Sequence, residues 1–232
     1  MEGSQAGPSC GVPTVLAAAA SKLHLAPEGA SRVFGIAGAA LVAWLLGLHW
    51  LALPLLILTM AVAAFFRDPE RLPPRISGVV LSGADGRVTD TGETTLPGSS
   101  QDRFRRVSVF MSPLNVHVNR ASVSGEVIAV EHTAGEFRAA YSDHASEHNE
   151  RNLVAFQDAE GRRHPMVQVA GYLARRIVCR VRPHDKVEAG LRIGLIMFGS
   201  RVDHYLPLEY RITVKIGDRV RAGETIIGEL AR

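Results

Sequence analysis

The stretch "RVSVFMSPLNVHVNR", residues 106–120, decides the fold class of this chain. Apolar and polar residues alternate in "RVSVF" and again in "VHVN", which is the period of a β-strand with two different faces. Glycine-containing turns recur along the following and preceding sequence as "ADGRV" (84–88), "VSGEV" (123–127), "DAEGRR" (158–163) and "KIGDRV" (215–220). Short alternating runs separated by such turns predict a mainly β domain over residues 76–232.

One pattern occurs twice within that domain. "HDKVEAGLRIGLI" (184–196) and "GDRVRAGETIIGEL" (217–230) both contain D-[KR]-V-x-A-G followed by "IG". Short strands joined by such turns resemble the elements of barrel-sandwich folds that carry lipoyl or biotinyl groups. A carrier module would present its modified lysine at a hairpin tip, and neither copy has a Met-Lys-Met type of tip. The pattern therefore predicts a barrel-sandwich-like β domain without a carrier function.

The apolar residues are concentrated before this domain. Residues 34–66 contain no Asp, Glu, Lys or Arg. One straight helix of that length would measure about 50 Å, against roughly 30 Å for the hydrocarbon core of a bilayer. Gly47, His49 and Pro54 offer a break, so the sequence predicts an apolar α-helical membrane hairpin. The hairpin could cross the bilayer or lie in one leaflet, and a buried helical pair of a soluble protein is the alternative.

These patterns divide the chain into four parts. Residues 1–33 are interpreted as a disordered tail and lead-in, 34–66 as the membrane-associated helical segment, 67–75 ("RDPERLPPR") as a stiff polar linker, and 76–232 as the main domain. The first residues lack the basic start and apolar core of a signal peptide. Together with the arginines that flank the apolar segment, this favours a domain on the cytoplasmic face of the cell membrane.

Composition excludes several functional classes. The chain has 26 Lys and Arg against 23 Asp and Glu, a net charge of +3, and its arginines form no dense tract. This disfavours nucleic acid as a partner and favours an anionic membrane surface. Cys10 and Cys179 lie far apart and form neither a disulfide framework nor a zinc motif. The histidines are not spaced as ligands either, so no metal site is predicted.

The segment "LIMFGSRVDHYLP", residues 195–207, contains the candidate chemistry. A serine-hydrolase elbow, G-x-S-x-G, would need glycine at the positions of Phe198 and Val202. A glycine directly before a serine instead suits an N-to-O acyl shift, in which the Ser200 hydroxyl attacks the accessible carbonyl of Gly199. β-Elimination of the resulting ester gives dehydroalanine and, after hydrolysis, a pyruvoyl group.

This segment resembles the processing site of the phosphatidylserine decarboxylase proenzymes, most closely their short bacterial and archaeal form. The resemblance covers residues 76–232 through "ADGRV" (84–88), "FMSPLNVHVNR" (110–120), "ASEHNERN" (145–152), "VAGYLARRIV" (169–178) and the Gly-Ser site. It implies self-cleavage between Gly199 and Ser200 into a β chain, 1–199, and an α chain, 200–232, which stay together as a heterodimer or a higher oligomer.

The resemblance also implies the reaction. Ser200 becomes the pyruvoyl group, the cofactor made by the chain itself, and no metal is needed. Its ketone forms a Schiff base with the amine of phosphatidylserine and acts as an electron sink while carbon dioxide leaves, and the product is phosphatidylethanolamine. The substrate lies in the lipid bilayer, which fits an apolar segment before the catalytic domain.

Residue roles follow from the same resemblance. In "NVHVN" the alternation puts Asn115, His117 and Asn119 on one strand face, and His117 is the candidate acid that protonates the product. Asp85 matches an aspartate that takes part in self-cleavage. Larger family members have a second histidine where this chain has Arg120, so self-cleavage is left to His117 or to His204. The pocket wall and substrate binding are assigned to Asn149, Glu150 and Arg151.

Two alternatives are weighed against this function. A membrane-tethered, non-catalytic barrel-sandwich binding module would explain the repeated pattern and the apolar segment, but it leaves the Gly-Ser site and His117 without a role. A pyruvoyl decarboxylase for another amino-acid-headed substrate would use the same chemistry on a different molecule. Whether the purified chain runs as one band or two separates the first alternative from the decarboxylases.

Overall fold

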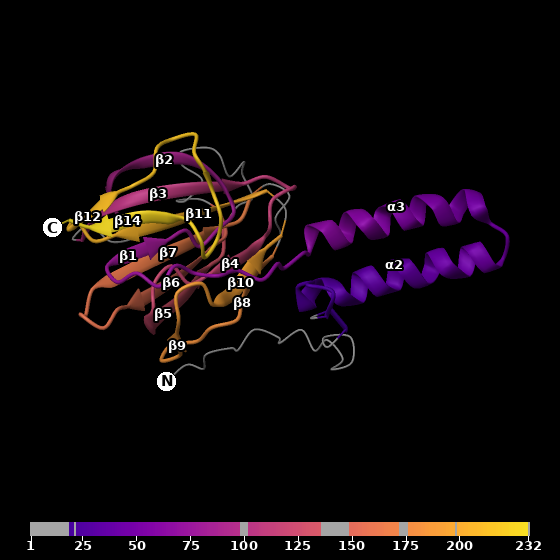
Figure 1. Cartoon of the computed structure of the whole chain (residues 1–232), viewed down its shortest axis with the longest axis horizontal. Coiled ribbons are helices and arrows are strands. Elements are labelled where there is room, and N and C mark those ends of the chain that lie inside the picture. Colours follow the sequence, from indigo (N-terminus) through magenta and orange to yellow (C-terminus); the bar gives the residue numbers. More distant parts are fainter. Residues whose placement is uncertain are drawn as a thin grey trace. The chain divides into compact units, whose positions relative to one another are not determined.

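The computed structural model describes residues 19–20, 22–97, 102–135, 149–171, 176–197 and 199–231. The expected tail falls mainly on residues 1–18, which lie outside this description. The chain forms two compact units, one up to Glu70 and one from Arg71 onward. The first unit is helical and the second consists of β-strands, as Figure 1 shows.

In the described part of the helical unit, α2 (Pro27–Leu45) and α3 (His49–Phe65) run side by side. The first begins earlier than the apolar segment does, because a proline fits the first helical turn and Glu28 there interacts favourably with the helix dipole. The break lies at Gly47, whose φ of +74° suits glycine. His49 begins α3, and Pro54, also expected at the break, lies inside that helix.

Small side chains form the contact between the two helices. The buried residues of α2 and α3 include Ala30, Ala40, Ala43 and Ala52, and small residues at such positions let helices approach closely. At the open end of the pair, the backbone N–H of Ala26 donates to the carbonyl of Phe66 at 2.7 Å. Among the residues that the structure describes, no helix combines the length and the apolar character needed to cross a membrane.

The main element of the second unit is an antiparallel eight-stranded sheet, here called the large sheet. In spatial order its strands are β13 (Arg219–Val220), β2 (Gly86–Thr95), β3 (Arg103–Met111), β11 (Ser200–Leu206), β7 (Arg163–Val169), β6 (Arg151–Gln157), β5 (Gly125–Thr133) and β9 (Lys186–Val187). The prediction of a mainly β domain is therefore confirmed. The strand that begins at Ser200 lies between β3 and β7, in the middle of the sheet.

Two three-stranded sheets accompany the large sheet. One has the order β1 (Val79–Leu81), β14 (Ile226–Leu230), β12 (Tyr210–Ile212), and the other β4 (Val118–Arg120), β10 (Arg192–Ile196), β8 (Ile177–Cys179). Residues of all three sheets share one buried apolar cluster, which includes Val107 and Val202 of the large sheet. We call this side of the large sheet its inner face. A second cluster, with Phe104 and Tyr205, lies on the outer face, so β11 is buried on both sides.

The pattern that occurs twice in the sequence is also a structural repeat. Its two copies supply β9 and β13, the opposite edge strands of the large sheet, and then β10 and β14, the central strands of the two small sheets. Equivalent hydrogen bonds fix both copies: the N–H of His184 donates to Val127 O at 2.7 Å, and the N–H of Gly217 donates to Val88 O at 2.8 Å. The domain thus consists of two similar halves that meet at β11.

Candidate active site

The Gly-Ser pair lies at the entrance to the central strand. Gly199 has a φ of +58°, a left-handed conformation that costs any residue with a side chain about 1–2 kcal/mol. Among the residues that the structure describes, and apart from its two chain neighbours, no atom lies within 4 Å of the position that a Cβ would occupy on Gly199, so the left-handed φ is the feature that favours glycine there. Ser200, the next residue, is 0% exposed and is the first residue of β11.

A chain of neutral polar side chains leads away from Ser200 across the inner face. Its hydroxyl donates to the sulfur of Met111 at 3.5 Å, and the Asn119 amide donates to the same sulfur at 3.6 Å. Gln168 donates to Asn119 Oδ1 at 2.7 Å and accepts from the Asn152 amide at 2.9 Å. All five are buried. A thioether is a weak acceptor, so the Ser200 hydroxyl is oriented without being strongly held.

Apart from Ser200, sequence reasoning identified only Asn119 of this network. The available signal was weak: Asn152 and Gln168 are polar residues at inner-face positions of β6 and β7, next to apolar residues that share the same faces. Period-2 alternation alone does not separate an inner from an outer face. The register of β6 with β7, which pairs Asn152 with Gln168, was needed to bring them together.

His117 lies next to the segment that leads to the Gly-Ser bond. Its carbonyl accepts from the N–H of Ile196 at 3.4 Å. Its Nδ1 lies 2.9 Å from Asn115 O, so Nδ1 carries the proton and Nε2 is the unprotonated nitrogen. The predicted strand through "NVHVN" is shorter than expected: Asn115 accepts from the N–H of Ser112 at 2.9 Å in a turn, and β4 begins only at Val118.

His204 is held as a neutral ring. Its Nδ1 lies 3.2 Å from Val107 O, and its Nε2 accepts from the N–H of Gly83 at 2.7 Å. Burial lowers the pKa of His204 to about 4, against an ordinary value of 6.5. With both nitrogens engaged and the ring uncharged at neutral pH, His204 is a hydrogen-bond acceptor that fixes the loop before β2. Of the two histidines considered for proton transfer, His204 thus has both ring nitrogens engaged in holding the fold.

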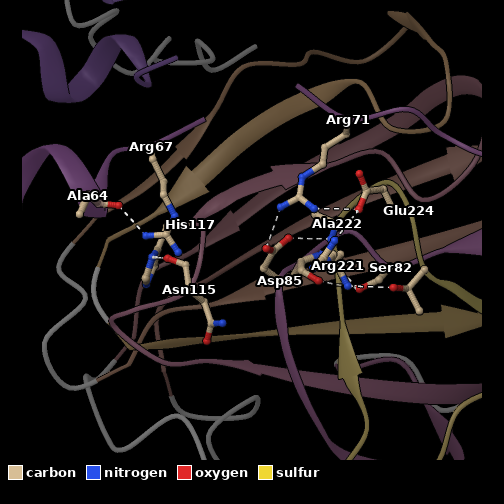
Figure 2. Close-up of polar contacts among 12 residues, drawn as sticks. Ala64, Arg67, Arg71, Ser82, Asp85, Asn115, His117, Arg221, Ala222 and Glu224 are labelled. Atoms are coloured by element: carbon tan, nitrogen blue, oxygen red, sulfur yellow. Dashed lines mark hydrogen bonds and ion pairs between the residues drawn. The ribbon is translucent and has the colours of Figure 1, made fainter. Parts of the chain in front are cut away.

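Asp85 is the last residue of the loop before β2, and its carboxylate forms an ion pair. Its Oδ2 lies 2.9 Å from Nη2 of Arg71, and its Oδ1 accepts from the N–H of Ala222 at 2.7 Å. The same guanidinium reaches Glu224 at 2.9 Å through Nη1. Figure 2 shows Arg71 between the two carboxylates, with Ala222 beside Asp85. A Cβ on the next residue, Gly86, would collide with the backbone of β3, which explains the glycine of "ADGRV".

The strand registers show that the segments carrying the candidate site residues reach the same end of the large sheet. Arg87 pairs with Phe110, Phe110 with Arg201, Arg201 with Val169, and Val169 with Arg151, in one row across β2, β3, β11, β7 and β6. Segments far apart in the sequence thus reach the same end of the large sheet. Because β3 intervenes, the backbones of β2 and β11 are about 10 Å apart at this end.

The predicted pocket-wall residues lie beside this row. The Asn149 amide donates to Ala170 O at 2.8 Å, and Glu150 O accepts from Ala170 N–H at 2.9 Å, which extends the pairing of β6 with β7. The Glu150 carboxylate lies 3.1 Å from His132 Nε2 on β5. Arg151 begins β6. Asn149 therefore fixes the backbone, whereas Glu150 and Arg151 lie at the sheet end that Ser200 shares.

Arg120 stands where the resemblance described above leads one to expect a second histidine. Its side chain is buried and donates to Gly190 O at 3.0 Å, and its backbone N–H donates to Gly83 O at 2.9 Å. A guanidinium does not give up its proton in proteins, so Arg120 connects two turns and transfers no proton. Among the described residues, no group of three or more His, Cys, Asp or Glu side chains could hold a metal ion.

Comparison with known proteins identifies the family of this chain. The sequence model of the phosphatidylserine decarboxylase family matches residues 58–228. The chain is 47% identical over 199 residues to a phosphatidylserine decarboxylase proenzyme of Mycolicibacterium smegmatis, covering 84% of this chain and 86% of the relative. It is 48% identical over 186 residues to the proenzyme of Chlorobium chlorochromatii, covering 80% and 84%. The chain therefore belongs to the phosphatidylserine decarboxylase family.

Proposed function

We propose that this chain is a proenzyme that cleaves itself between Gly199 and Ser200, converts Ser200 into a pyruvoyl group, and decarboxylates phosphatidylserine to phosphatidylethanolamine and carbon dioxide. The observation that carries the proposal is the Gly199–Ser200 pair itself. A left-handed glycine precedes a fully buried serine at the start of the central strand, in a chain that belongs to this family.

The self-cleavage balances without an added reactant other than water. Ser200 Oγ attacks the carbonyl carbon of Gly199, the peptide C–N bond breaks, and an ester remains. Removal of the Ser200 Cα proton then breaks the Cβ–O bond and releases the Gly199 carboxylate. Hydrolysis of the remaining enamine group by water releases ammonia and leaves the pyruvoyl group on residue 200, at the new N-terminus of 200–232.

The residues around Ser200 fit such a group. The position is buried, and the side chains that lead from it, Met111, Asn119 and Gln168, are neutral, so no charge there would oppose an electrophilic carbonyl. The Asn119 amide offers N–H donors on this face. When formed, the pyruvoyl group supplies the electron sink that decarboxylation requires.

His117 is proposed to supply the proton that replaces the carboxylate. Its Nδ1–H is engaged with Asn115 O, which fixes the ring and directs proton exchange to Nε2. Its backbone is tied to Ile196, at the end of the strand before Gly199. Glu150 and Arg151, at the same sheet end as Ser200, are proposed to contact the charged headgroup of the substrate, because a carboxylate and a guanidinium match its amine and phosphate groups.

Intact mass spectra of the wild type and of Ser200→Ala test the proposal. The wild type should give one fragment ending at Gly199 and a second, 200–232, lighter than the unmodified peptide by the mass of one ammonia molecule. Ser200→Ala should remain whole. The cleaved protein should then release carbon dioxide from phosphatidylserine vesicles. A wild-type chain that stays whole on vesicles, or cleaves without decarboxylating phosphatidylserine, would contradict this function.

We further propose that the turn between α2 and α3 inserts into the bilayer interface. Around this turn, large apolar side chains are exposed: Trp44 by 61%, Leu45 by 74% and Trp50 by 76%. Tryptophan favours membrane interfaces, and an exposed apolar patch of this kind is typical of a membrane contact. The catalytic unit would thereby stay near a substrate that does not leave the membrane.

The composition makes this proposal easy to test. Trp44 and Trp50 are the two tryptophans of the sequence, so intrinsic fluorescence reports on the turn alone. Phosphatidylserine vesicles should shift the emission to shorter wavelength, and lipids carrying a quencher in the acyl chain should reduce it. Replacing Leu45 by serine should weaken vesicle binding, whereas replacing Leu208 of the β unit, also an exposed leucine, should not. Unchanged emission would refute insertion.

A further inference from the structure

The two halves of the β unit allow Asp85 to be compared with an equivalent residue. Asp85 precedes the glycine of "ADGRV", and Ser124 precedes the glycine of "SGEV" in the other half. Both side chains accept a backbone N–H of the repeated V-x-A-G turn: Asp85 from Ala222 at 2.7 Å, and Ser124 from Ala189 at 2.9 Å. A neutral hydroxyl therefore suffices to hold this turn, and the negative charge of Asp85 is not required for it.

That charge is nevertheless kept in a largely buried place. The side chains of Arg71 and Asp85 are 9% and 12% exposed. Burying a charge is costly unless it is paired, and Arg71 pairs it at 2.9 Å while its other terminal nitrogen binds Glu224. The turn does not need the charge of Asp85, and the fold has to compensate it. Such a buried charge indicates that the carboxylate takes part in a reaction.

We propose that Arg71 is a positioning residue for self-cleavage, which keeps the Asp85 carboxylate ionised and fixes its orientation at the end of the large sheet where Ser200 lies. This inference rests on the proposed function, because self-cleavage is the reaction it serves. Arg71 binds one carboxylate oxygen, Ala222 binds the other, and His204 fixes the loop through Gly83. Arg71 thus acts through Asp85 and does not itself contact the reacting bond.

The charges around Asp85 allow a test by pH. Arg71 lies 2.9 Å from the Asp85 carboxylate, and Glu224 binds the other terminal nitrogen of the same guanidinium. Arg221 lies 3.8 Å from Glu224. Arg120 approaches the same turn, since its Cδ lies 3.0 Å from the position of a Cβ on Gly223. Removing the positive charge of Arg71 should make Asp85 easier to protonate, and removing the negative charge of Glu224 should make it harder.

The experiment follows cleavage of the full chain after cell-free synthesis, with samples transferred to buffers between about pH 4 and 8 and the cleaved fraction measured on gels. In Arg71→Met the acid midpoint of the cleavage rate should rise by about 1 pH unit or more, since a neighbouring arginine shifts a carboxyl pKa by about 1–3 units. In Glu224→Gln it should move the other way. Arg71→Lys, which keeps the charge, should retain a midpoint close to that of the wild type.

A matched control comes from a second ion pair of the C-terminal segment. Arg211 binds Glu229 at 2.7 Å on an exposed surface, so Arg211→Met should leave both rate and midpoint unchanged. Asp85→Ser copies the residue of the other half; it should fold, as judged by resistance to proteolysis, and should fail to cleave. A merely structural role for Arg71 would slow cleavage in both charge variants without opposite shifts.

Three results overturn the inference while leaving the proposed function intact. In the first, Asp85→Ser cleaves as fast as the wild type. In the other two, the midpoints of Arg71→Met and Glu224→Gln move in the same direction, or they do not move. A wild type that never cleaves overturns the proposed function and this inference with it. If Arg71→Met fails to fold, the opposite shift in Glu224→Gln and the retained midpoint in Arg71→Lys still decide.

Discussion

The imidazole Nε2 of His204 accepts the backbone N–H of Gly83 at 2.7 Å. This bond joins the central strand of the large sheet to the loop that ends in Asp85, and it lies on the same face of β11 as Ser200. It requires a neutral ring, because a protonated Nε2 is a donor and cannot accept. The stability of the loop therefore depends on pH through a single histidine.

We expect the stability of the chain to fall as the pH falls from 6.5 to about 4. The folded pKa of His204, about 4, lies below its unfolded value of 6.5, so the unfolded state binds the proton more readily. The contribution is fully present above pH 6.5 and is lost as the pH falls through the folded pKa, up to about 3 kcal/mol of unfolding free energy. Urea unfolding of Ser200→Ala, which stays in one piece, measures it at each pH.

The matched variant for this prediction is His204→Asn in the same Ser200→Ala background. It should be less stable at pH 7.5 but should show a flatter dependence between pH 6.5 and 4, and the difference between the two curves isolates His204 from the carboxylates that also titrate there. Two parallel curves would show that His204 is not the group responsible.

Gly199→Ala should slow self-cleavage. The left-handed φ of +58° at Gly199 costs an alanine roughly 1–2 kcal/mol, and relaxation of the backbone would move the carbonyl that Ser200 must attack. Gly161 has a φ of +81°, left-handed like that of Gly199, but lies in the turn between β6 and β7. Gly161→Ala should therefore lose similar stability and cleave at the wild-type rate. Equal slowing in both would indicate a general effect of strain.

After cleavage, residues 200–232 should remain bound to residues 1–199 under native conditions. The shorter chain supplies β11 between β3 and β7, β13 beside β2, and β14 beside β1, so its backbone hydrogen bonds run to several strands of the longer one. Size-exclusion chromatography should give one peak that contains both chains, and denaturant should separate them. A short chain that elutes alone without denaturant would refute this interpretation.

Gln168→Leu should destabilise the β unit by about 1–3 kcal/mol, because it leaves the buried amides of Asn119 and Asn152 without their bonds to Gln168. Gln157 offers the control: it lies on the neighbouring strand, and its one amide bond, to Gly161 O, is exposed. Gln157→Leu should change stability by less than about 0.5 kcal/mol. Denaturant unfolding in the Ser200→Ala background compares the two, and equal losses would count against the buried network.

Local patterns predicted the elements well where one residue or one period decides them. The alternation of "RVSVF" predicted the strand that contains residues 106–110, and Gly47 predicted the helix break. Pro54 misled, because the helix that begins at His49 continues through the proline without ending there. The alternation of "NVHVN" also misled, since the Asn115 side chain bonds the backbone of Ser112 and forms a turn instead of a strand.

The sequence by itself determined the β character of residues 76–232, the repeated V-x-A-G turn and the Gly199–Ser200 pair, because each depends on neighbours within a few residues. Only the tertiary structure decided which histidine is neutral, what binds Asp85 and which polar residues line the inner face. Those properties depend on burial and on strand register, as in the contact of Arg71 with Asp85 and that of His204 with Gly83 across 121 positions. No local pattern contains that information, because long-range pairing fixes it.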